Sequence, residues 1–306
     1  MNILVTGGAG FIGSHLVDAL IERGHSVFVY DNLSSGKTTN INPQATFIEG
    51  DITHEEVLHK LFTDYTFDAV FHLAAQINVR KSTEDPLFDA HTNILASLNL
   101  INMASKKGVQ KIIFSSTGGV MYGDTSIRPT PETHNENPLS PYGIAKLTID
   151  KYLAFYREAT PLKTISLRYG NVYGPRQNPH GEAGVVAIFL NKMLGEEQPT
   201  INGDGMQSRD YIFVGDVVRA NIAALETESA SGIYNIGTGK ETTVNEIFSL
   251  LNDFFDNSFQ EIHAPSIPGE QKMSSLDSAR AQDELTWQPT VSLRDGLKQT
   301  FEWFKK

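Results

Sequence analysis

The sequence predicts an α/β fold in which helices cover both faces of a parallel β-sheet. Apolar runs typical of strands alternate with segments of helical periodicity along the first half of the chain. The first such unit, residues 2–31, joins two strands through a glycine-rich turn and a helix. No linker is long enough to separate independent domains, so the C-terminal part should form a smaller α/β domain interleaved with the first.

The glycine-rich turn follows the first expected strand, residues 2–5. Gly7, Gly10 and Gly13 have a Gly-x-x-Gly-x-x-Gly spacing. The first glycine permits a tight turn, the second lets a pyrophosphate approach the backbone, and the third lets the helix pack close to the strand. A glycine triplet alone is often only a turn, but this one lies between a strand and a helix that ends near Gly24. This context predicts a dinucleotide site on a Rossmann-type, doubly wound parallel sheet.

An acidic residue follows the second expected strand, residues 26–30. The carboxylate of Asp31 would accept hydrogen bonds from the adenosine ribose hydroxyls and would repel a 2′-phosphate. The expected cofactor is therefore NAD rather than NADP, which disfavours a ketone reductase that uses NADPH.

The remaining elements are expected in chain order. Strands are expected at residues 46–50, 69–73, 111–115 and 163–168, and helices at 54–62, 86–107, 140–159, 185–194, 244–255 and the C-terminus. Turn-rich stretches cover residues 32–43, 171–184 and 199–210, and residues 211–214, 216–225 and 232–236 should return to the sheet. These assignments predict a cofactor domain over residues 1–170 with returning segments at about 211–238, and a substrate domain over residues 171–210 and 239–306.

Composition narrows the expected partners. The 306 residues include 25 Lys and Arg against 36 Asp and Glu, a formal net charge of −11 with no basic block, so nucleic acid is not expected as a partner. The absence of cysteine excludes disulfides and thiolate chemistry, and the nine histidines show no spacing typical of metal ligands. The chain shows neither a signal peptide nor an apolar run long enough for a membrane span. We therefore expect a cytoplasmic protein with no metal site and no membrane partner.

The two longest expected helices predict a homodimer. Helices at about 86–107 and 140–159 carry apolar residues on more than one side, which exceeds what one sheet face would cover. We expect these helices to pair with their copies in a second chain. The alternative is that the C-terminal region of the same chain covers them.

A tyrosine and a lysine share one face of the helix at 140–159. Among the ten tyrosines, only Tyr142 has a lysine four residues later, Lys146. An ammonium near a phenol favours the phenolate, so we expect the pKa of Tyr142 to be lowered towards neutrality, where it can act as a general base. Such a pair alone is more often a packing accident, but the strand at 111–115 continues into Ser116 and Thr117, which place hydroxyls at the same edge of the sheet.

Several segments, spread from residue 5 to residue 239, together carry a family resemblance. They are VTGGAGFIGSHL, YDNLSSG, HLAAQ, FSST with the following YG, SPYGIAK, RYGNVYGPRQ, DGMQSRDYIFVGDV and YNIGTG. In these segments the chain resembles the extended short-chain dehydrogenases/reductases and, within that group, the UDP-glucose 4-epimerases. The resemblance implies an isomerase of galactose metabolism that uses NAD to invert C4 of a UDP-hexose through a transient 4-keto sugar.

The resemblance also assigns roles to residues at matching positions. Tyr142 would take the proton of the sugar's 4-hydroxyl while a hydride leaves C4 for NAD⁺, Lys146 would hold the nicotinamide ribose and tune Tyr142, and Thr117 would hydrogen-bond the 4-oxygen. The keto sugar would then turn over and receive the hydride on its other face, so NAD should stay bound. The residues expected at the cofactor are Gly7, Gly10, Phe11, Ile12, Gly13, Asp31, Asn32, Asp51, Ile52, Leu73, Ala74, Ala75, Asn93, Ser115, Tyr142 and Lys146.

The nucleotide half of the substrate is assigned to the second domain. Asn171 and Arg209 match family residues that contact the diphosphate, and Glu270 matches the acid that holds the uridine ribose. A guanidinium suits a phosphate because it donates hydrogen bonds in a fixed fork. The alternative for Arg209 is a salt bridge to Asp210 or Asp216.

Two positions depart from the family pattern. Ile267 stands where relatives commonly carry a second phosphate-binding arginine, so either Lys272 or Arg176 substitutes for it or the diphosphate binds more weakly. Ser274 stands where a bulky residue in some relatives blocks N-acetylated sugars. We therefore hypothesise that UDP-N-acetylglucosamine is accepted in addition to UDP-glucose.

Three other functions compete with epimerisation. A nucleotide-sugar 4,6-dehydratase would carry Asp-Glu after Thr117, where this chain has Gly118 and Gly119. A uronate 4-epimerase or decarboxylase needs a cation for the sugar carboxylate, which Arg80 could supply, so this alternative stays open. A non-catalytic NAD-sensing protein is disfavoured because the threonine, tyrosine and lysine are all present.

Overall fold

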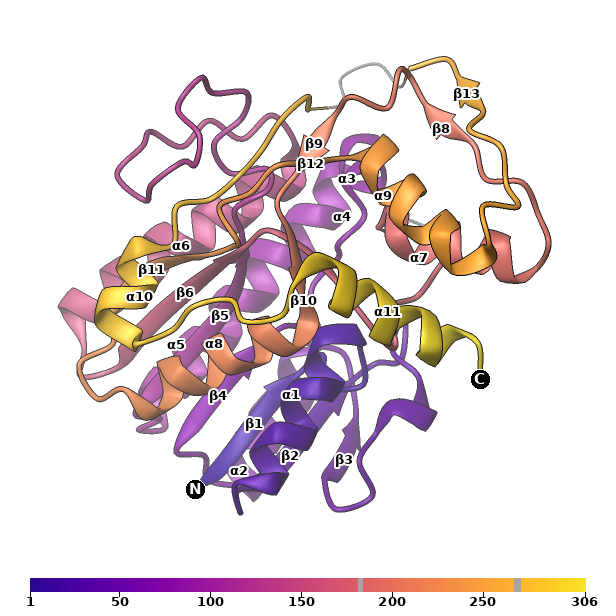
Figure 1. Cartoon of the computed structure of the whole chain (residues 1–306). Helices are drawn as coiled ribbons and strands as arrows, with labels where there is room; N and C mark the ends of the chain where they lie inside the picture. The colour runs from indigo at the N-terminus through magenta and orange to yellow at the C-terminus, as the bar shows by residue number, and fades with distance from the viewer. Residues whose placement is uncertain (181–183, 267–270) are drawn as a thin grey trace.

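A seven-stranded parallel β-sheet organises the molecule (Figure 1). The computed structural model describes residues 1–180, 184–266 and 271–306. The strand order is β11-β6-β5-β4-β1-β2-β3, and every neighbouring pair is parallel. This is the doubly wound, Rossmann-type order expected from the sequence, with its reversal beside β1. The strands are β1 Asn2–Thr6, β2 Ser26–Asp31, β3 Thr46–Glu49, β4 Ala69–His72, β5 Lys111–Thr117, β6 Lys163–Tyr169 and β11 Gly232–Ile236.

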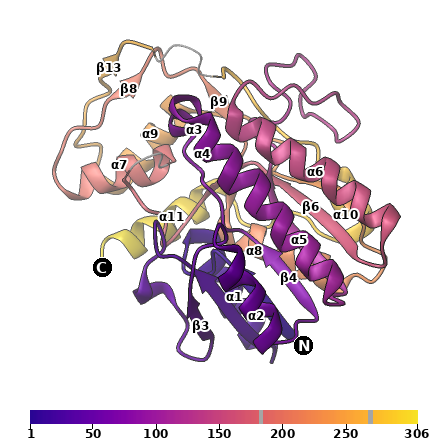
Figure 2. The same ribbon diagram turned by 180° about the vertical axis from the view of Figure 1, so that it is seen from behind.

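Helices cover both faces of the sheet because successive side chains of its strands point to opposite sides (Figures 1 and 2). In β1, Ile3 and Val5 belong to the apolar core on one face, whereas Leu4 belongs to the core on the other. The first face is covered by α1 Phe11–Glu22 and α8 Val214–Glu226, and the second by α2 Glu55–Asp64, α5 Ala96–Lys106 and α6 Pro141–Ala159.

The shorter elements gather above the carboxyl edge of the sheet (Figure 1). Their strands form small pairs: β7 Asn171–Tyr173 with β10 Tyr211–Phe213, β8 Ile201–Asn202 with β13 His263–Ala264, and β9 Ser208–Arg209 with β12 Thr242–Thr243. Their helices are α7 Val185–Leu194, α9 Val244–Asn252 and α11 Leu293–Phe304, whereas α10 Ala279–Leu285 lies at the side of the sheet against β11 and α8. None of the helices in the described ranges is both long and apolar enough to cross a membrane.

Several segments differ from the sequence prediction, among them the helix α3 Val79–Glu84, where no element was expected. Residues 211–213 pair with β7 and not with the large sheet, and residues 216–225 form most of α8 instead of a strand. The helix α10 lies where a loop was expected. The error at α8 has a physical cause: this helix is buried on several sides, so its apolar residues are not confined to one helical face and the helical period is weak.

Candidate active site

The glycine turn joins β1 to α1 at the carboxyl edge of the sheet. Gly7 has a φ of +73°, and a Cβ there would lie 2.7 Å from the backbone nitrogen of Ala74. A Cβ at Gly13 would lie 2.1 Å from the carbonyl oxygen of Gly7. Gly10 precedes α1, and no side chain caps the helix. The first N–H groups of α1 are therefore available to a pyrophosphate in a turn that has no room for side chains, and these residues fit a dinucleotide.

Two carboxylates lie beside this turn, at the ends of neighbouring strands. Buried Asp31 accepts hydrogen bonds from the backbone N–H groups of Ala9 at 3.0 Å and Leu33 at 2.8 Å. Asp51 follows β3 and accepts a hydrogen bond of 2.7 Å from the side chain of Asn32. Burial raises the pKa of Asp51, but hydrogen bonds from Thr53 and Asn32 together lower it below its ordinary value. Asp31, Asn32 and Asp51 are thus together on one side of the turn, and buried Ile52 follows Asp51.

The loop after β4 carries Leu73, Ala74 and Ala75 and is held by Asn93. The amide of Asn93 accepts a hydrogen bond from the backbone N–H of Gln76 at 2.9 Å and donates one to its carbonyl at 2.8 Å. Asn93 lies in a π-helical turn, η2 His91–Leu95, which separates α4 Pro86–Ala90 from α5. π-Helical turns are rare and often occur at functional sites. The expected helix at 86–107 is therefore present but is interrupted where Asn93 turns towards the cofactor loop.

An acid that sequence reasoning missed lies in the same cluster. Asp89 of α4 is only 1% exposed, and its Oδ1 accepts hydrogen bonds from the side chains of Gln76 at 2.8 Å and Asn93 at 2.9 Å. Its spacing of four residues from Asn93 was the only signal in the sequence. Burial raises the pKa of Asp89 above its ordinary value, although these hydrogen bonds and the charge of Lys146 oppose the rise.

Tyr142 and Lys146 lie one turn apart at the start of α6. The hydroxyl of Ser140 caps this helix by accepting a hydrogen bond from a backbone N–H of the first turn. The buried ammonium of Lys146 donates a hydrogen bond of 2.8 Å to the carbonyl of Ser115 and lies 5.8 Å from the ring centroid of Tyr142. The pair is therefore held at the carboxyl end of β5, the strand that ends with Thr117.

Burial controls the ionisation of both side chains. Burial lowers the pKa of Lys146 to about 8, although the charges of Asp150 and Asp89 raise it. Burial, followed by the charge of Asp89, raises the pKa of Tyr142 well above its ordinary value. The expectation that Lys146 lowers the pKa of Tyr142 towards neutrality is therefore wrong for the chain alone, because the desolvation of the phenolate outweighs the nearby ammonium.

We expect the replacement of Asp89 by asparagine to shift the alkaline limb of the activity profile to lower pH. The carboxylate of Asp89 raises the pKa of Lys146, so without it the ammonium loses its proton earlier as the pH rises. The measurement is kcat from about pH 6 to about pH 10, with Glu84→Gln as a control that removes an exposed negative charge nearby. An identical alkaline limb in Asp89→Asn and the wild type would contradict this expectation.

The two glycines after Thr117 allow other segments to approach the backbone. A Cβ at Gly118 would lie 2.4 Å from Cδ1 of Leu276, and one at Gly119 would lie 3.3 Å from Oδ1 of Asn171. The structure thus brings Asn171, at the start of β7, close to the end of β5. Leu276 fills the space beside Gly118, the first of the two positions at which a dehydratase would carry its Asp-Glu pair.

Arg209 lies in β9 and contacts the segment that precedes Ser274. Its Nη1 donates a hydrogen bond of 3.3 Å to the carbonyl of Lys272. The two aspartates considered as alternative partners are engaged elsewhere. Asp210 accepts four hydrogen bonds from residues 238–239 and 276, and Asp216 forms an ion pair with Arg219.

Ser274 is 7% exposed, and its hydroxyl has no hydrogen-bond partner among the described residues. A buried hydroxyl is rarely left unpaired, so Ser274 is a candidate for contact with a bound molecule. Glu270 and Ile267, the other two positions singled out in this segment, lie outside the described residues.

Arg176 contacts helix α1. Its Nη1 lies 2.8 Å from Oδ2 of Asp18 on α1. The contact is an ion pair without a hydrogen bond, so Arg176 stays a candidate to substitute for the phosphate-binding arginine that Ile267 replaces. Lys272 stays a candidate, because its side chain lies on the surface.

A buried ionic cluster fixes α6 against the sheet and was also missed. Arg168 of β6 is fully buried and donates hydrogen bonds of 2.9 Å to Asp150, Glu136 and the hydroxyl of Tyr122. Asp150 lies one helical turn after Lys146, so the cluster holds the helix that carries the tyrosine–lysine pair. The arginine begins the segment RYGNVYGPRQ, but its burial depends on partners far away in the sequence.

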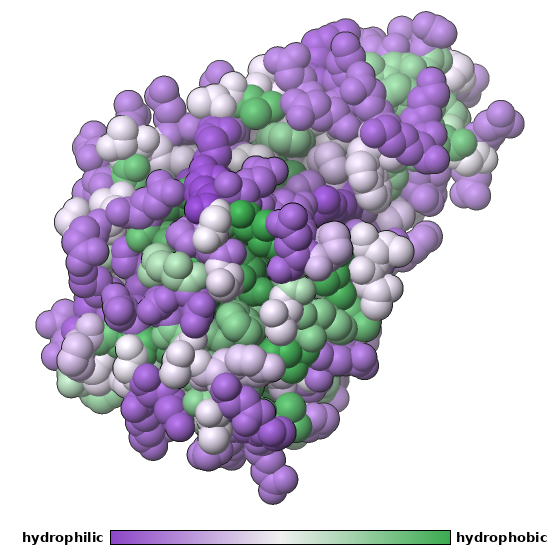
Figure 3. All heavy atoms as spheres, turned by 90° about the horizontal axis from the view of Figure 1, so that it is seen from below, coloured by the Kyte–Doolittle hydropathy of each residue, from purple (hydrophilic) through white to green (hydrophobic). Residues whose placement is uncertain are grey.

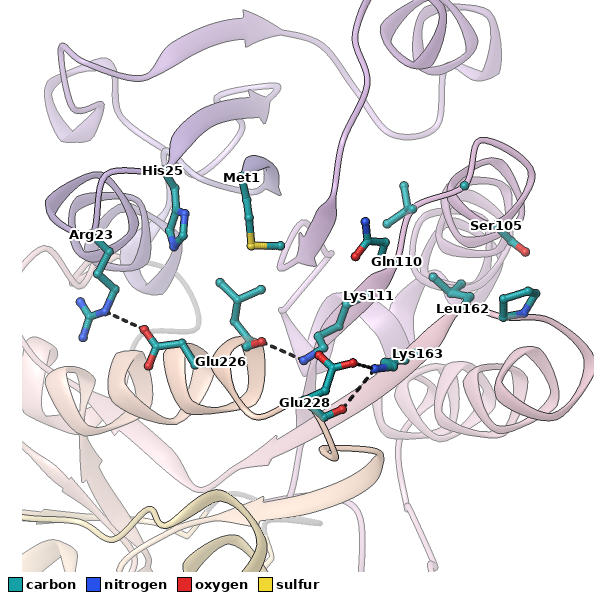
Figure 4. Close-up of a pocket in the computed structure, with 14 residues that line it drawn as sticks. Met1, Arg23, His25, Ser105, Gln110, Lys111, Leu162, Lys163, Glu226 and Glu228 are labelled. Carbon is teal, nitrogen blue, oxygen red and sulfur yellow. Dashed lines mark hydrogen bonds and ion pairs between the residues drawn. The ribbon is translucent and has the colours of Figure 1, made fainter.

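A hollow of about 730 Å³ lies at the opposite, amino-terminal edge of the sheet (Figure 4). In the view from below, hydrophilic side chains surround apolar ones on the surface of the molecule (Figure 3). None of the expected site residues lines this hollow, and its cations have partners. Lys111 donates to three carbonyls at the end of α8, Arg23 pairs with Glu226, and Lys163 pairs with Glu228.

Comparisons with known proteins agree with this geometry. Residues 3–237 match the model of the NAD dependent epimerase/dehydratase family. The chain is 45% identical to a putative UDP-glucose 4-epimerase of Methanocaldococcus jannaschii, covering 99% of this chain and 98% of that one. Its structure resembles that of a UDP-glucose 4-epimerase with UDP-glucose from Thermotoga maritima, with a TM-score of 0.97, 51% identity and coverage of 99% and 98%. It also resembles a UDP-N-acetylglucosamine 4-epimerase from Methanobrevibacter ruminantium in complex with UDP-N-acetylmuramic acid, with a TM-score of 0.93, 38% identity and coverage of 99% and 97%.

Proposed function

From the premise that this chain belongs to the NAD dependent epimerase/dehydratase family, we propose that it is a UDP-hexose 4-epimerase that interconverts UDP-glucose and UDP-galactose. The observation that carries this proposal is the tyrosine–lysine pair of α6 beside the end of β5, at the same carboxyl edge of the sheet as a glycine turn whose helix has no side-chain cap. Fold alone supports many chemistries, so the proposal depends on this site.

The side chains at the carboxyl edge suit an epimerase with a tightly held cofactor. Bound NAD would supply the oxidising and reducing capacity needed at C4 of the sugar. Tyr142 would take the proton of the 4-hydroxyl and later return a proton to the 4-keto oxygen. Burial disfavours the ionised form of Tyr142, so Lys146, held by the carbonyl of Ser115, would act on the phenol together with the positive charge of bound NAD⁺, and Thr117 would hydrogen-bond the 4-oxygen.

The residues that would hold NAD lie along the carboxyl ends of β1, β2, β3, β4 and β5. The N–H groups after Gly10 would bind the pyrophosphate, Asp31 the adenosine ribose and Lys146 the nicotinamide ribose. The further residues that we assign to this site are Gly7, Phe11, Ile12, Gly13, Asn32, Asp51, Ile52, Leu73, Ala74, Ala75, Asn93, Ser115 and Tyr142.

The second part of the chain would bind the nucleotide of the substrate. We assign the diphosphate to Asn171 and Arg209, since an arginine matches phosphate geometry, and the uridine ribose to Glu270. We place the cofactor domain at residues 1–170 with 211–238, and the substrate domain at 171–210 and 239–306. A cytoplasmic location of the protein stays a prediction from the sequence.

Ser274 suggests that the sugar site also accepts an N-acetyl group. We expect the wild type to epimerise UDP-N-acetylglucosamine as well as UDP-glucose, because the side chain of serine is small and its hydroxyl has no partner in the described part of the chain. Replacement of Ser274 by tyrosine should lower kcat/KM for the acetylated sugar roughly a hundredfold, while UDP-glucose serves as the internal control. If the wild type turns over UDP-glucose but never the acetylated sugar, this extension is wrong.

The proposed activity can be tested with three sugar nucleotides. Purified protein without added NAD is incubated with UDP-glucose, UDP-N-acetylglucosamine or UDP-glucuronate, and C4 inversion is followed by NMR. We expect turnover of UDP-glucose. Turnover of the glucuronate alone would favour the uronate epimerase and a role for Arg80, which lies in α3 Val79–Glu84. No inversion of any of the three would reject the proposal.

We further propose that the outer face of α4, η2 and α6 forms a homodimer interface. Large apolar side chains are exposed there, including Leu87 at 82% and Phe155 at 60%, with Leu95 and Ile144 nearby. Their exposure contradicts the alternative that the C-terminal region covers these helices. We expect a dimeric mass in light scattering and a monomer for Phe155→Asp, whereas Asp at exposed Ile127, on another surface, should leave the dimer intact. A monomeric wild type would contradict the interface.

A further inference from the structure

The carboxylate of Asp18, on helix α1, contacts two loops. Asp18 of α1 accepts a hydrogen bond of 2.7 Å at Oδ1 from the side chain of Asn42, in the loop after β2. Its Oδ2 lies 2.8 Å from Nη1 of Arg176, in the loop after β7. The side chains of Asp18 and Arg176 are 27% and 26% exposed, so this ion pair is more sheltered than an ordinary surface pair.

A second contact lies one helical turn earlier. Nε2 of His15 lies 2.9 Å from the carbonyl oxygen of Pro175, next to Arg176 in the chain. Burial lowers the pKa of His15 below its ordinary value, so the ring is neutral at neutral pH and its Nε2–H donates to this carbonyl. His15 and Asp18 lie three residues apart on one face of α1, and this face therefore holds the loop after β7 at two points.

The loop after β2 is also fastened to the glycine turn. The backbone N–H of Lys37 and the side chain of Asn40 donate hydrogen bonds of 3.1 and 3.2 Å to the carbonyl of Ala9. Arg176, in the other loop, has a φ of +66°, which is uncommon for a residue with a side chain. A backbone in this region is maintained only where surrounding contacts hold it, as Asp18 and His15 do here.

We propose that the contacts of Asp18 with Asn42 and Arg176, and of His15 with Pro175, form a clasp that keeps NAD captive by slowing its release. The inference rests on the proposed function, in which the cofactor is restored in every turnover and need not leave. A dinucleotide on the glycine turn would sit at the amino end of α1, and the clasp holds one loop from each part of the chain against later turns of the same helix, at His15 and Asp18. Release requires these loops to move away from α1, so loosening the clasp speeds the loss of NAD.

The test measures NAD release from the purified holoenzyme. The time course of bound NAD is followed in the presence of an enzyme that destroys free NAD, for the wild type, Asp18→Ala, Arg176→Gln and the double variant. Asp18→Ala is expected to release NAD about tenfold faster, since it removes both loop contacts of the carboxylate. Arg176→Gln should show a smaller increase, and the double variant should match Asp18→Ala because the same ion pair is lost in each.

The matched control is the ion pair at the other end of the same helix. Arg23 lies 3.3 Å from Glu226, and Glu226→Ala removes this contact between α1 and α8. Glu226→Ala should release NAD at the wild-type rate. If Asp18→Ala fails to fold, Arg176→Gln still tests the contact with the loop after β7, and Asn42→Ala tests the contact with the loop after β2.

The outcomes separate this inference from the proposed function. Wild-type release rates in Asp18→Ala and Arg176→Gln would overturn the clasp while leaving epimerisation intact. A wild-type release rate in Arg176→Gln together with a raised KM for UDP-glucose would make Arg176 a substrate ligand and would also overturn the clasp. Wild-type protein that carries no NAD would instead contradict the proposed function.

Discussion

Replacing Tyr142 by phenylalanine is expected to lower kcat for C4 epimerisation of UDP-glucose about a thousandfold. Phenylalanine keeps the ring but removes the hydroxyl that would exchange a proton with the sugar's 4-oxygen. Lys146 keeps its hydrogen bond to Ser115, so the positions of β5 and α6 should not change. The measurement is the initial rate of UDP-galactose formation, together with the amount of NAD bound per chain.

The control for Tyr142→Phe lies on the same helix. Tyr152 is 42% exposed on α6, and Tyr152→Phe should retain the wild-type rate. Tyr142→Phe should also retain bound NAD and the wild-type melting temperature, because only a hydroxyl is lost. A Tyr142→Phe variant with undiminished turnover would show that another group moves the proton and would revive a non-catalytic role for the tyrosine–lysine pair.

Replacing Gly13 by alanine is expected to give a protein that purifies without NAD. The new Cβ would lie 2.1 Å from the carbonyl oxygen of Gly7, which is a backbone atom and cannot rotate away. The turn must therefore shift, which moves the first N–H groups of α1 away from the pyrophosphate. Overpacking of this kind should also lower the free energy of unfolding by about 1–3 kcal/mol. Bound nucleotide per chain and chemical denaturation measure the two effects.

Gly24→Ala separates loss of the cofactor from general strain. Gly24 follows α1 with a φ of +79°, and a Cβ there would meet no atom within 4 Å. Alanine at this position should cost about 1 kcal/mol in stability through backbone strain but should leave bound NAD unchanged. Full NAD occupancy in Gly13→Ala would mean that the glycine turn does not hold the dinucleotide.

The central sheet could be predicted from the sequence because its strands are short apolar runs between turn signals. The apolar run at residues 163–168 corresponds to β6, Lys163–Tyr169, and the apolar run at 232–236 corresponds to β11. The same reasoning failed at residues 216–225, where Val217, Val218 and Ile222 are buried in one core but belong to a helix. The pairing of β7 with β10 could not be predicted either. Strands of three residues are too short for a recognisable pattern, and these two are adjacent only in the folded chain.

The candidate site was less predictable than the fold. The four-residue spacing places Tyr142 and Lys146 on one helix face but contains no information about their burial. The sequence therefore predicted a lowered pKa for Tyr142, whereas burial raises it. Asp89 and Arg168 are charged residues that the sequence alone would place at the surface. Their burial depends on partners from other elements, such as Gln76 for Asp89.

The most direct test of a captive cofactor follows the hydrogen at C4 of the sugar. UDP-glucose with deuterium at C4 is incubated with purified protein and no added NAD, and the UDP-galactose formed is analysed by NMR and mass spectrometry. We expect C4 to be inverted and the deuterium to remain at C4 of the product. Loss of the deuterium to solvent, or no inversion at C4, would contradict it.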